Sequence, residues 1–270
     1  MPAIDIKNKR PIGVFDSGVG GLSVLIELQK ILPNESFVFL ADQFYVPYGE
    51  KTKKELVNLT SRITNYFIKN HDIKMLVVAC NTATCGAIDE LREKYTLPIV
   101  GTVPAVKTAA ENTKSGTIAV ISTPSTSQSI ALKKLIKDNC QGLAVLNIGC
   151  KDLENVVEEG EFHTVEVNKL LLKYLKDIKN SNTDYLVLGC THYPFLKKYI
   201  DKILGAQVKL IDGGKAIAKH TKSLLTNHFM ESTQKQRGET LYFTTGDPTK
   251  FSKVASKLLK ARVQAHKIKI

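Results

Sequence analysis

Short apolar runs alternate along the chain with longer stretches in which apolar residues recur every three or four positions. Runs rich in Val, Ile and Leu are typical of buried parallel strands, whereas the longer spacing is typical of amphipathic helices. In the first part of the chain the expected strands are IGVFDSG (12–18), FVFLAD (37–42), MLVVAC (75–80) and LPIVGTV (97–103). The helices expected between them are LSVLIELQKIL (22–32), TKKELVNLTSRITNYFIKN (52–70) and ATCGAIDELREKY (83–95). This alternation predicts an α/β fold with a doubly wound parallel sheet.

The same order of elements then starts again. The second set consists of TIAVISTPST (117–126), SIALKKLIKDN (129–139), LAVLNIGC (143–150), VEVNKLLLKYLKDI (165–178) and YLVLGC (185–190). Asp16 precedes Cys80 by 64 residues and Thr123 precedes Cys190 by 67 residues, so the two sets match in length as well as in type. We therefore expect two pseudo-symmetric doubly wound parallel-sheet lobes with the active site between them.

The C-terminal part of the chain is expected to return to the first lobe. It contains a helical stretch (216–229), a polar linker, the strand LYFTT (241–245), and Asp247 with Pro248 as the N-cap and first residue of a last helix. The expected domains are therefore residues 1–102 plus 215–270 for the first lobe and residues 103–214 for the second.

Two cysteines occupy the same position in the two sets. Cys80 ends the run MLVVAC and is followed by Asn81 and Thr82, and Cys190 ends YLVLGC and is followed by Thr191 and His192. Open α/β sheets bind ligands at the carboxyl ends of their strands. Two thiols that face each other across one pocket suit a reaction that removes a proton from one face of a carbon and returns it on the other.

Three interpretations of these cysteines compete. Cysteine is often a buried core residue, but the polar side chains beside both thiols argue against simple core filling. A zinc site is disfavoured, because Cys80 and Cys85 are too far apart for a C-x-x-C pair and Cys190 with His192 is not a usual ligand pair. In the catalytic interpretation a helix N-terminus after each cysteine lowers the pKa of its thiol.

Acid–base groups lie near both cysteines in the sequence. His192 follows Cys190 by two residues and is placed to exchange a proton with the thiol or with a substrate, although a lone histidine is often structural. Asp16 is the corresponding candidate in the first lobe. Glu158 is a further candidate acid, with a surface charge at a helix end as the alternative. Cys85, Cys140 and Cys150 lack such polar neighbours and are expected to be structural.

Glycine-rich and hydroxyl-rich loops supply candidate ligand-binding groups. DSGVGG (16–21) lacks the third glycine of a dinucleotide fingerprint, and Asp16 would repel a pyrophosphate. We expect instead a tight turn whose N–H groups and Ser17 hydroxyl bind a smaller anion such as a carboxylate. In PYGEKT (47–52), Pro47 fixes φ and Gly49 permits an unusual one, so that Tyr48 and its neighbours present backbone N–H groups.

Composition narrows the class of protein. Of the 270 residues, 43% are hydrophobic and 24% charged, as in ordinary globular proteins, and no apolar stretch approaches a membrane span. The first ten residues lack the apolar core of a signal peptide, and five unclustered cysteines agree with a reducing compartment, so a cytoplasmic protein is expected. The net charge of +12 comes mostly from dispersed lysines, which favours a solvated surface over a nucleic-acid site.

Taken in order, the motifs DSGVGGLSV, PYGEKT, VACNTAT and LGCTHYP resemble those of glutamate racemases, over about residues 12 to 250. The resemblance implies interconversion of L- and D-glutamate by two cysteines, without cofactor or metal. It also implies a supply of D-glutamate for peptidoglycan, and hence for cell-wall biogenesis and cell shape. A homodimer is expected as well.

The resemblance also implies roles for individual residues. Cys80 would take the α-proton of D-glutamate and Cys190 that of L-glutamate, assisted by Asp16 and His192 respectively. Glu158 would be a further catalytic acid. The groups implied to hold the substrate are Asp16, Ser17, Tyr48, Gly49, Asn81, Thr82, Thr126, Thr191 and His192.

The chain departs from the usual pattern of the family in three places. Gln43, Phe44 and Tyr45 stand where Thr-Ala-Arg is usual, Ser122 replaces a glycine, and residues 150–158 replace a proline-rich, apolar version. Two other functions stay open at this stage. An aspartate racemase of the same fold would keep both cysteines and change the side-chain pocket. A non-enzymatic binding protein would usually have lost one cysteine.

Overall fold

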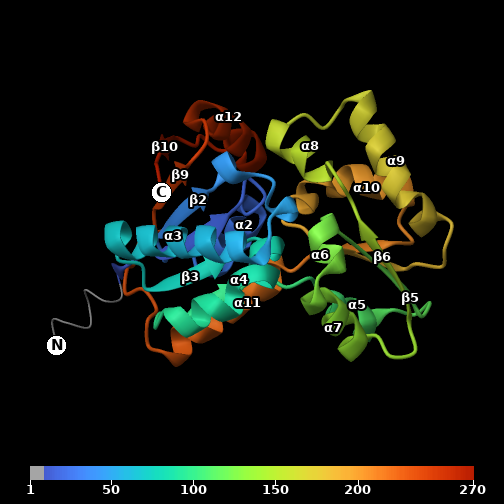
Figure 1. Ribbon diagram of the computed structural model, residues 1–270, viewed down its shortest axis with the longest axis horizontal. Coiled ribbons are helices and arrows are strands. Elements are labelled where there is room, and N and C mark those ends of the chain that lie inside the picture. Colours follow the sequence, from blue (N-terminus) through green and yellow to red (C-terminus); the bar gives the residue numbers. More distant parts are fainter. Residues whose placement is uncertain (1–8) are drawn as a thin grey trace. The chain divides into compact units, whose positions relative to one another are not determined.

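A computed structural model describes residues 9–270, which divide into two compact units. The first unit takes in the described part of Met1–Thr102 together with Gly214–Ile270, and the second is Val103–Gly213. Residues 1–8 lie outside the described residues. They belong to the expected first lobe and to the N-terminal segment that lacks the apolar core of a signal peptide. Each unit is an α/β body in Figure 1, which confirms the predicted fold class.

The first unit contains a six-stranded sheet in the order β10-β9-β2-β1-β3-β4, and all its neighbouring strands run parallel. Its regular elements are β1 (Ile12–Asp16), α2 (Leu22–Ile31), β2 (Phe37–Ala41), the 3-10 helices η1 (Gln43–Tyr45) and η2 (Tyr48–Glu50), α3 (Lys53–His71), β3 (Met75–Val78), α4 (Asn81–Lys94), β4 (Ile99–Gly101), α11 (Gly214–Asn227), β9 (Thr240–Thr244), α12 (Pro248–Leu259) and β10 (Ala265–Lys267). The C-terminal part of the chain joins this sheet, because β9 pairs with β2, and Asp247 caps α12.

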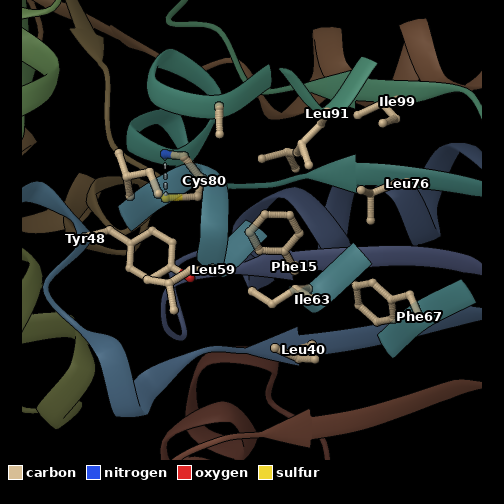
Figure 2. Close-up of a cluster of buried hydrophobic side chains, with 14 of the residues drawn as sticks. Phe15, Leu40, Tyr48, Leu59, Ile63, Phe67, Leu76, Cys80, Leu91 and Ile99 are labelled. Carbon is tan, nitrogen blue, oxygen red and sulfur yellow. Dashed lines mark hydrogen bonds between the residues drawn. The ribbon is translucent and has the colours of Figure 1, made fainter. Parts of the chain in front are cut away.

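Side-chain alternation along the strands explains why helices cover both faces of this sheet. Val38 and Leu40 of β2 belong to one buried cluster with α3 and α4, which Figure 2 shows. Phe39, between them in the chain, points to the opposite face and stacks on Phe251 of α12. Helices α2 and α11 pack against each other, and α12 also contacts α2. The central strands are buried on both sides, as their continuous apolar sequences predicted.

The second unit contains a four-stranded parallel sheet in the order β6-β5-β7-β8. Its regular elements are α5 (Val106–Asn112), β5 (Thr117–Ser122), α6 (Pro124–Gln128), α7 (Ile130–Asn139), β6 (Ala144–Gly149), α8 (Leu153–Glu159), α9 (Val165–Lys179), β7 (Tyr185–Leu188), the 3-10 helix η3 (Tyr193–Leu196), α10 (Lys197–Leu204) and β8 (Lys209–Ile211). Helix α5 packs against α7, and α9 packs against α10. No helix within residues 9–270 is long and apolar enough to cross a membrane.

The two sheets share one topology and one register. The order β2-β1-β3-β4 in the first unit corresponds to β6-β5-β7-β8 in the second. Phe15 of β1 pairs with Val78 of β3, and Ile121 of β5 pairs with Leu188 of β7. Two residues beyond these pairs, Ser17 corresponds to Thr123 and Cys80 to Cys190. The duplication predicted from the sequence therefore extends to the position of the cysteines. Each cysteine lies at the switch point of its sheet, which is the place where the strand order reverses.

An aspartate clamps the loop between α5 and β5 to the start of β7. Asp184 accepts hydrogen bonds from the Thr113 hydroxyl at 2.6 Å and from the backbone N–H groups of Lys114 at 2.7 Å and Ser115 at 3.1 Å. Desolvation alone would raise its pKa, but these hydrogen bonds outweigh it and lower the pKa of Asp184 to about 2.

We expect Asp184→Asn to destabilise the second unit. A carboxyl whose folded pKa lies below its unfolded value stabilises the fold above that unfolded value, and this contribution is lost as pH falls through the folded pKa. After a discount for solvent screening, the loss at pH 7 is about 1 kcal/mol. Denaturant unfolding measured at pH 7 and at pH 2 should show a deficit at pH 7 that disappears at the lower pH. A deficit of equal size at both pH values would contradict this electrostatic origin.

Candidate active site

Cys80 stands at the junction of strand β3 and helix α4. It is the N-cap of α4, and its sulfur accepts a hydrogen bond from the Ala83 N–H at 3.5 Å. The Ser17 hydroxyl lies 3.8 Å from the same sulfur. The side chain is 4% exposed and belongs to the apolar cluster of the first unit. The predicted helix N-terminus beside this thiol is confirmed, and its N–H groups favour the thiolate.

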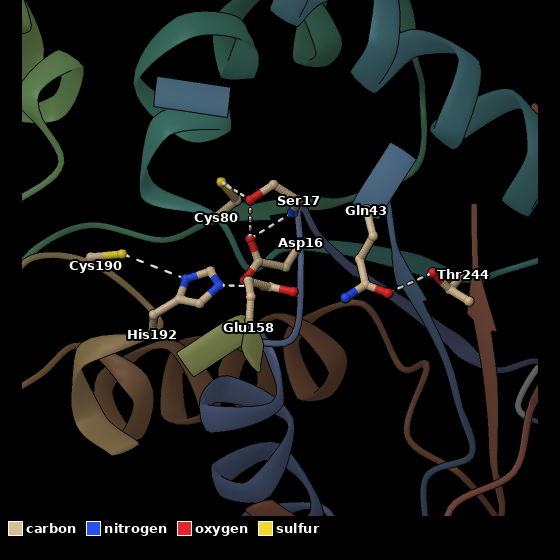
Figure 3. Close-up of polar contacts among 8 residues, drawn as sticks. All are labelled: Asp16, Ser17, Gln43, Cys80, Glu158, Cys190, His192 and Thr244. Carbon is tan, nitrogen blue, oxygen red and sulfur yellow. Dashed lines mark hydrogen bonds and ion pairs between the residues drawn. The ribbon is translucent and has the colours of Figure 1, made fainter. Parts of the chain in front are cut away.

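Asp16 ends strand β1 next to this cysteine and is completely buried. Its Oδ1 accepts hydrogen bonds from the Ser17 N–H at 2.6 Å and the Ser17 hydroxyl at 3.1 Å, as Figure 3 shows. Ser17 therefore stands between the carboxylate and the Cys80 sulfur, so that Asp16 reaches the thiol through a hydroxyl. Gly21 is needed here, because a Cβ at that position would lie 2.6 Å from the Asp16 Cβ.

Tyr48 lies in η2, near Cys80 and Asp16. Its hydroxyl donates to Asp42 Oδ2 at 2.6 Å, and the Thr245 hydroxyl donates to Asp42 Oδ1 at 2.8 Å. Burial raises the pKa of Tyr48 well above its usual value, and the negative charges of Asp42, Cys80 and Asp16 raise it further. Asp42 therefore fixes the loop that carries Tyr48. In the sequence Asp42 stands at the end of the apolar run FVFLAD (37–42), and nothing there indicates its contacts with Tyr48 and Thr245.

The expectation of an unusual backbone at Gly49 is wrong. Gly49 lies inside the 3-10 helix Tyr48–Glu50 and is not among the glycines with positive φ. Neither Gly18 nor Gly20 of the DSGVGG loop has a positive φ either. In this half of the site the glycines matter through close approach, as Gly21 does against Asp16, rather than through a left-handed backbone.

Asn81 and Thr82 form the first turn of α4 beside Cys80, and both are buried. Among the described residues, the Asn81 Oδ1 atom is buried and has no hydrogen-bond donor. A buried acceptor without a donor costs free energy, and most buried polar atoms in native proteins have a hydrogen-bond partner. The Asn81 amide oxygen can therefore accept a hydrogen bond from a ligand that carries an N–H or O–H group.

Cys190 follows strand β7 in the second unit and is 7% exposed. Its sulfur lies 3.6 Å from His192 Nδ1. Burial raises the pKa of the Cys190 thiol, and the neighbouring His192 opposes this shift without cancelling it. The prediction of a helix N-terminus at this cysteine is wrong in detail. The residues after Cys190 enter the short 3-10 helix η3, whose N-cap is His192. Cys190 thus has a histidine beside it, where Cys80 has the N-terminus of an α-helix.

His192 is buried between the thiol and a carboxylate. Its Nε2 lies 2.6 Å from Glu158 Oε1, which comes from helix α8 (Figure 3). Burial by itself lowers the pKa of His192, but the contacts with Cys190 and Glu158 raise it well above its usual value. The alternative interpretation of Glu158 as a surface charge at a helix end is wrong, because Glu158 is only 9% exposed.

Small hydroxyl residues surround the switch point of the second sheet. Thr123 caps α6, and its hydroxyl donates to the Thr126 hydroxyl at 3.0 Å. Thr126 and Thr191 are both buried.

The three remaining cysteines differ from the two at the switch points. Burial raises the pKa of Cys140, and it raises the pKa of Cys150 to about 12. Cys85 is half-buried within α4.

Within the described residues, no group of three or more His, Cys, Asp or Glu side chains is arranged to hold a metal ion. None of the five cysteines forms a disulfide bond. Each unit thus holds one thiol at its switch point with a different acid–base partner, a hydroxyl and aspartate in the first and a histidine and glutamate in the second. The arrangement in each unit can take up or release a proton at sulfur.

Comparison with known proteins shows similarity to racemases over most of the chain. A family model described as Asp/Glu/Hydantoin racemase matches residues 27–221. A glutamate racemase from Fusobacterium nucleatum is 42% identical over 259 residues, which cover 95% of this chain and 97% of that protein.

Solved structures give the same answer. A glutamate racemase from Bacillus anthracis has a TM-score of 0.88 at 32% identity, with 97% of this chain and 98% of the other covered. A glutamate racemase from Francisella tularensis, solved in complex with D-glutamate, has a TM-score of 0.84 at 32% identity with the same coverage. The chain therefore belongs to the Asp/Glu/Hydantoin racemase family and, within it, to the glutamate racemases.

Proposed function

We propose that this protein interconverts L- and D-glutamate by a two-base mechanism that needs neither cofactor nor metal, in which Cys80 and Cys190 act on opposite faces of the α-carbon. The observation that carries the proposal is the equivalent register of the two cysteines, each with its own buried proton-transfer partner. A related glutamate racemase binds D-glutamate in its solved structure, which supports the same substrate here.

The surroundings of the two thiols favour opposite protonation states. The N-terminus of α4 favours the thiolate form of Cys80, whereas burial disfavours the thiolate form of Cys190. In the direction from D- to L-glutamate, the Cys80 sulfur takes the α-proton and the Cys190 thiol returns one from the opposite face. The reverse direction starts from the opposite protonation states, with His192 and Asp16 assisting their respective sulfurs.

The proposed substrate contacts follow from the chemistry of glutamate. The unsatisfied Asn81 Oδ1 would accept a hydrogen bond from the substrate ammonium group. Hydroxyl and backbone N–H groups of Ser17, Thr82 and Thr191 would donate to carboxylate oxygens, with further donors from Tyr48, Gly49 and Thr126. Fixed donors around the α-carboxylate would stabilise the carbanion-like transition state that forms when the α-proton leaves.

The test is incubation of the purified protein with L- or D-glutamate in D₂O. Circular dichroism should decay to zero from either enantiomer, and proton NMR should show loss of the α-proton. Treatment with EDTA should leave the rate unchanged. Turnover of aspartate at an equal or higher rate would assign the protein to aspartate racemisation instead.

A supply of D-glutamate for peptidoglycan is the proposed role in the cell, with the cytoplasm as the proposed location and a homodimer as the proposed assembly. All three rest on the resemblance to glutamate racemases. Depletion of the protein should lead to loss of cell shape that added D-glutamate reverses. Sedimentation velocity measures the assembly directly.

We expect Glu158→Gln to lower the pKa of His192, because a neutral amide stabilises an imidazolium less than a carboxylate does. The turnover number should fall about a hundredfold, in the range typical of a lost acid–base contribution. NMR titration of the histidine ring protons measures the pKa, and circular dichroism measures the turnover.

Glu159→Gln is the matched control, since Glu159 is the neighbouring residue of α8 and is exposed. It should leave both quantities unchanged. An unchanged His192 titration in the Glu158 variant would show that the carboxylate only fills space.

A further inference from the structure

The first unit contains a cavity of about 310 Å³ that lies outside the thiol site. It is lined by Phe44 and Tyr45 of η1, by Thr245 after β9, and by residues 267–270. The volume falls in the range of small-molecule sites and is too small for a folded partner. Phe44 is 72% exposed at this cavity, which is unusual for a phenylalanine.

Positive charge and aromatic surface meet at this cavity. Lys267 and Lys269 line it and are exposed. The Tyr45 ring carries Lys51 Nζ at 5.9 Å and the Arg62 guanidinium at 5.8 Å from its centre, and the Phe44 ring stands edge-on to it at 5.0 Å. A flat apolar group can stack here, and an anionic group would be attracted by the surrounding cations.

The cavity is connected by hydrogen bonds to the loop that carries Tyr48. The Thr245 hydroxyl accepts from the Phe44 N–H at 3.0 Å and donates to Asp42 at 2.8 Å. Asp42 in turn accepts from the Tyr48 hydroxyl at 2.6 Å. Thr244, beside Thr245, donates to Gln43 at 2.9 Å, as Figure 3 shows. A ligand against Phe44 and Thr245 would therefore tighten η1 and η2 together.

We propose that this cavity is a binding site for a flat organic anion, with an aromatic ring against Phe44 and Tyr45 and an acidic group near Lys267 and Lys269. Through Thr245 and Asp42, the bound anion restrains the Tyr48 loop. The proposed site is formed by the residues that line this cavity, and ligand binding there does not depend on the racemase reaction. It also gives a role to the segment Gln43-Phe44-Tyr45, where the chain departs from the pattern of the proteins that it resembles.

Anilinonaphthalene sulfonate is a suitable probe, because it joins a flat apolar ring system to one negative charge and fluoresces in apolar surroundings. Phe44→Ala should weaken its binding about fivefold through lost ring contact. The double change Lys267→Glu with Lys269→Glu should weaken it about tenfold by charge reversal. Uncharged phenylnaphthylamine should bind the unchanged protein more weakly than the sulfonate.

Phe229→Ala and Lys253→Glu are the matched controls. Phe229 is an exposed phenylalanine outside the cavity and Lys253 an exposed lysine on α12, so both variants should bind the probe normally. All the changed side chains are exposed, and circular dichroism verifies folding. Equal binding by the cavity variants and the controls would overturn the site, and equal binding of the neutral probe would overturn the anionic class.

Hydrogen exchange tests the connection without an activity measurement. The backbone amides of Tyr45, Val46 and Lys51 close the turns of η1 and η2. Bound probe should slow their exchange about threefold, since local opening is the step that the ligand restrains. Loss of this effect in Thr245→Val, with probe affinity kept, would support the pathway. Unchanged exchange in the unaltered protein would overturn the coupling.

Discussion

Replacing either switch-point cysteine by alanine is expected to abolish racemisation while leaving the fold intact. Cys80→Ala and Cys190→Ala should each lower the turnover number about a thousandfold or more, because one face of the α-carbon then has no acid–base group. Each change removes a single sulfur atom from a buried position, so the fold should be kept at a modest cost in stability. Circular dichroism of L- and D-glutamate gives the rate.

The two variants should differ in the proton exchange that remains. In Cys80→Ala, the surviving Cys190 can take the α-proton of L-glutamate and return a deuteron to the same face. Exchange in D₂O should then occur with L-glutamate alone, without inversion, and Cys190→Ala should show the reverse preference. Cys85→Ala is the matched control in α4 and should racemise normally. Full activity in either switch-point variant would eliminate the two-base mechanism.

Loss of the buried Lys74 ammonium group is expected to produce the largest change in stability. Lys74 Nζ lies 2.6 Å from Glu35 Oε2, and the two side chains are 0% and 4% exposed. The ammonium also donates to the Met230 carbonyl at 2.8 Å, and Glu35 accepts from the Ser232 N–H at 2.7 Å. The pair thus ties the chain after α11 to the sheet. Lys74→Met leaves a buried carboxylate without its cation, at a cost of about 3–5 kcal/mol.

The pH dependence of this variant follows from the remaining glutamate. Burial already raises the pKa of Glu35, and the loss of Lys74 removes a contact that lowers it. A carboxyl with a raised folded pKa stabilises the fold below its unfolded pKa, and this stability is lost as pH rises through the folded value. The loss of stability caused by Lys74→Met should therefore become smaller as the pH falls through the raised folded pKa of Glu35 toward its unfolded value.

Denaturant unfolding measures this effect, with Lys219→Met as the control for an exposed lysine of α11. The double change Lys74→Met with Glu35→Leu should recover much of the loss, because no charge is then left buried. A double variant as unstable as the single one would show that packing, and not the unpaired carboxylate, is responsible.

Local pattern was sufficient for most of the architecture. Each strand that carries a switch-point residue is a continuous apolar run, and burial on both faces needs no more information than that. The repeat of elements predicted the duplicated sheet order, and Asp247 with Pro248 predicted the start of α12. Helix α8 was expected only as a helix end at Glu158, because its seven residues are too few for a clear periodicity.

The sequence by itself determined the two cysteines, the polar residues after them and the strands that end there, because strand periodicity and loop chemistry are local properties. Only the tertiary structure decided the partners of these groups. Glu158 meets His192 across 34 residues of chain, Thr245 meets Asp42 across 203, and Glu35 meets Lys74 in the interior. Such contacts depend on which elements pack together, and a buried carboxylate has the same letter in the sequence as an exposed one. Burial raises the pKa of Cys190, whereas the contacts with Cys190 and Glu158 raise the pKa of His192 against the effect of burial.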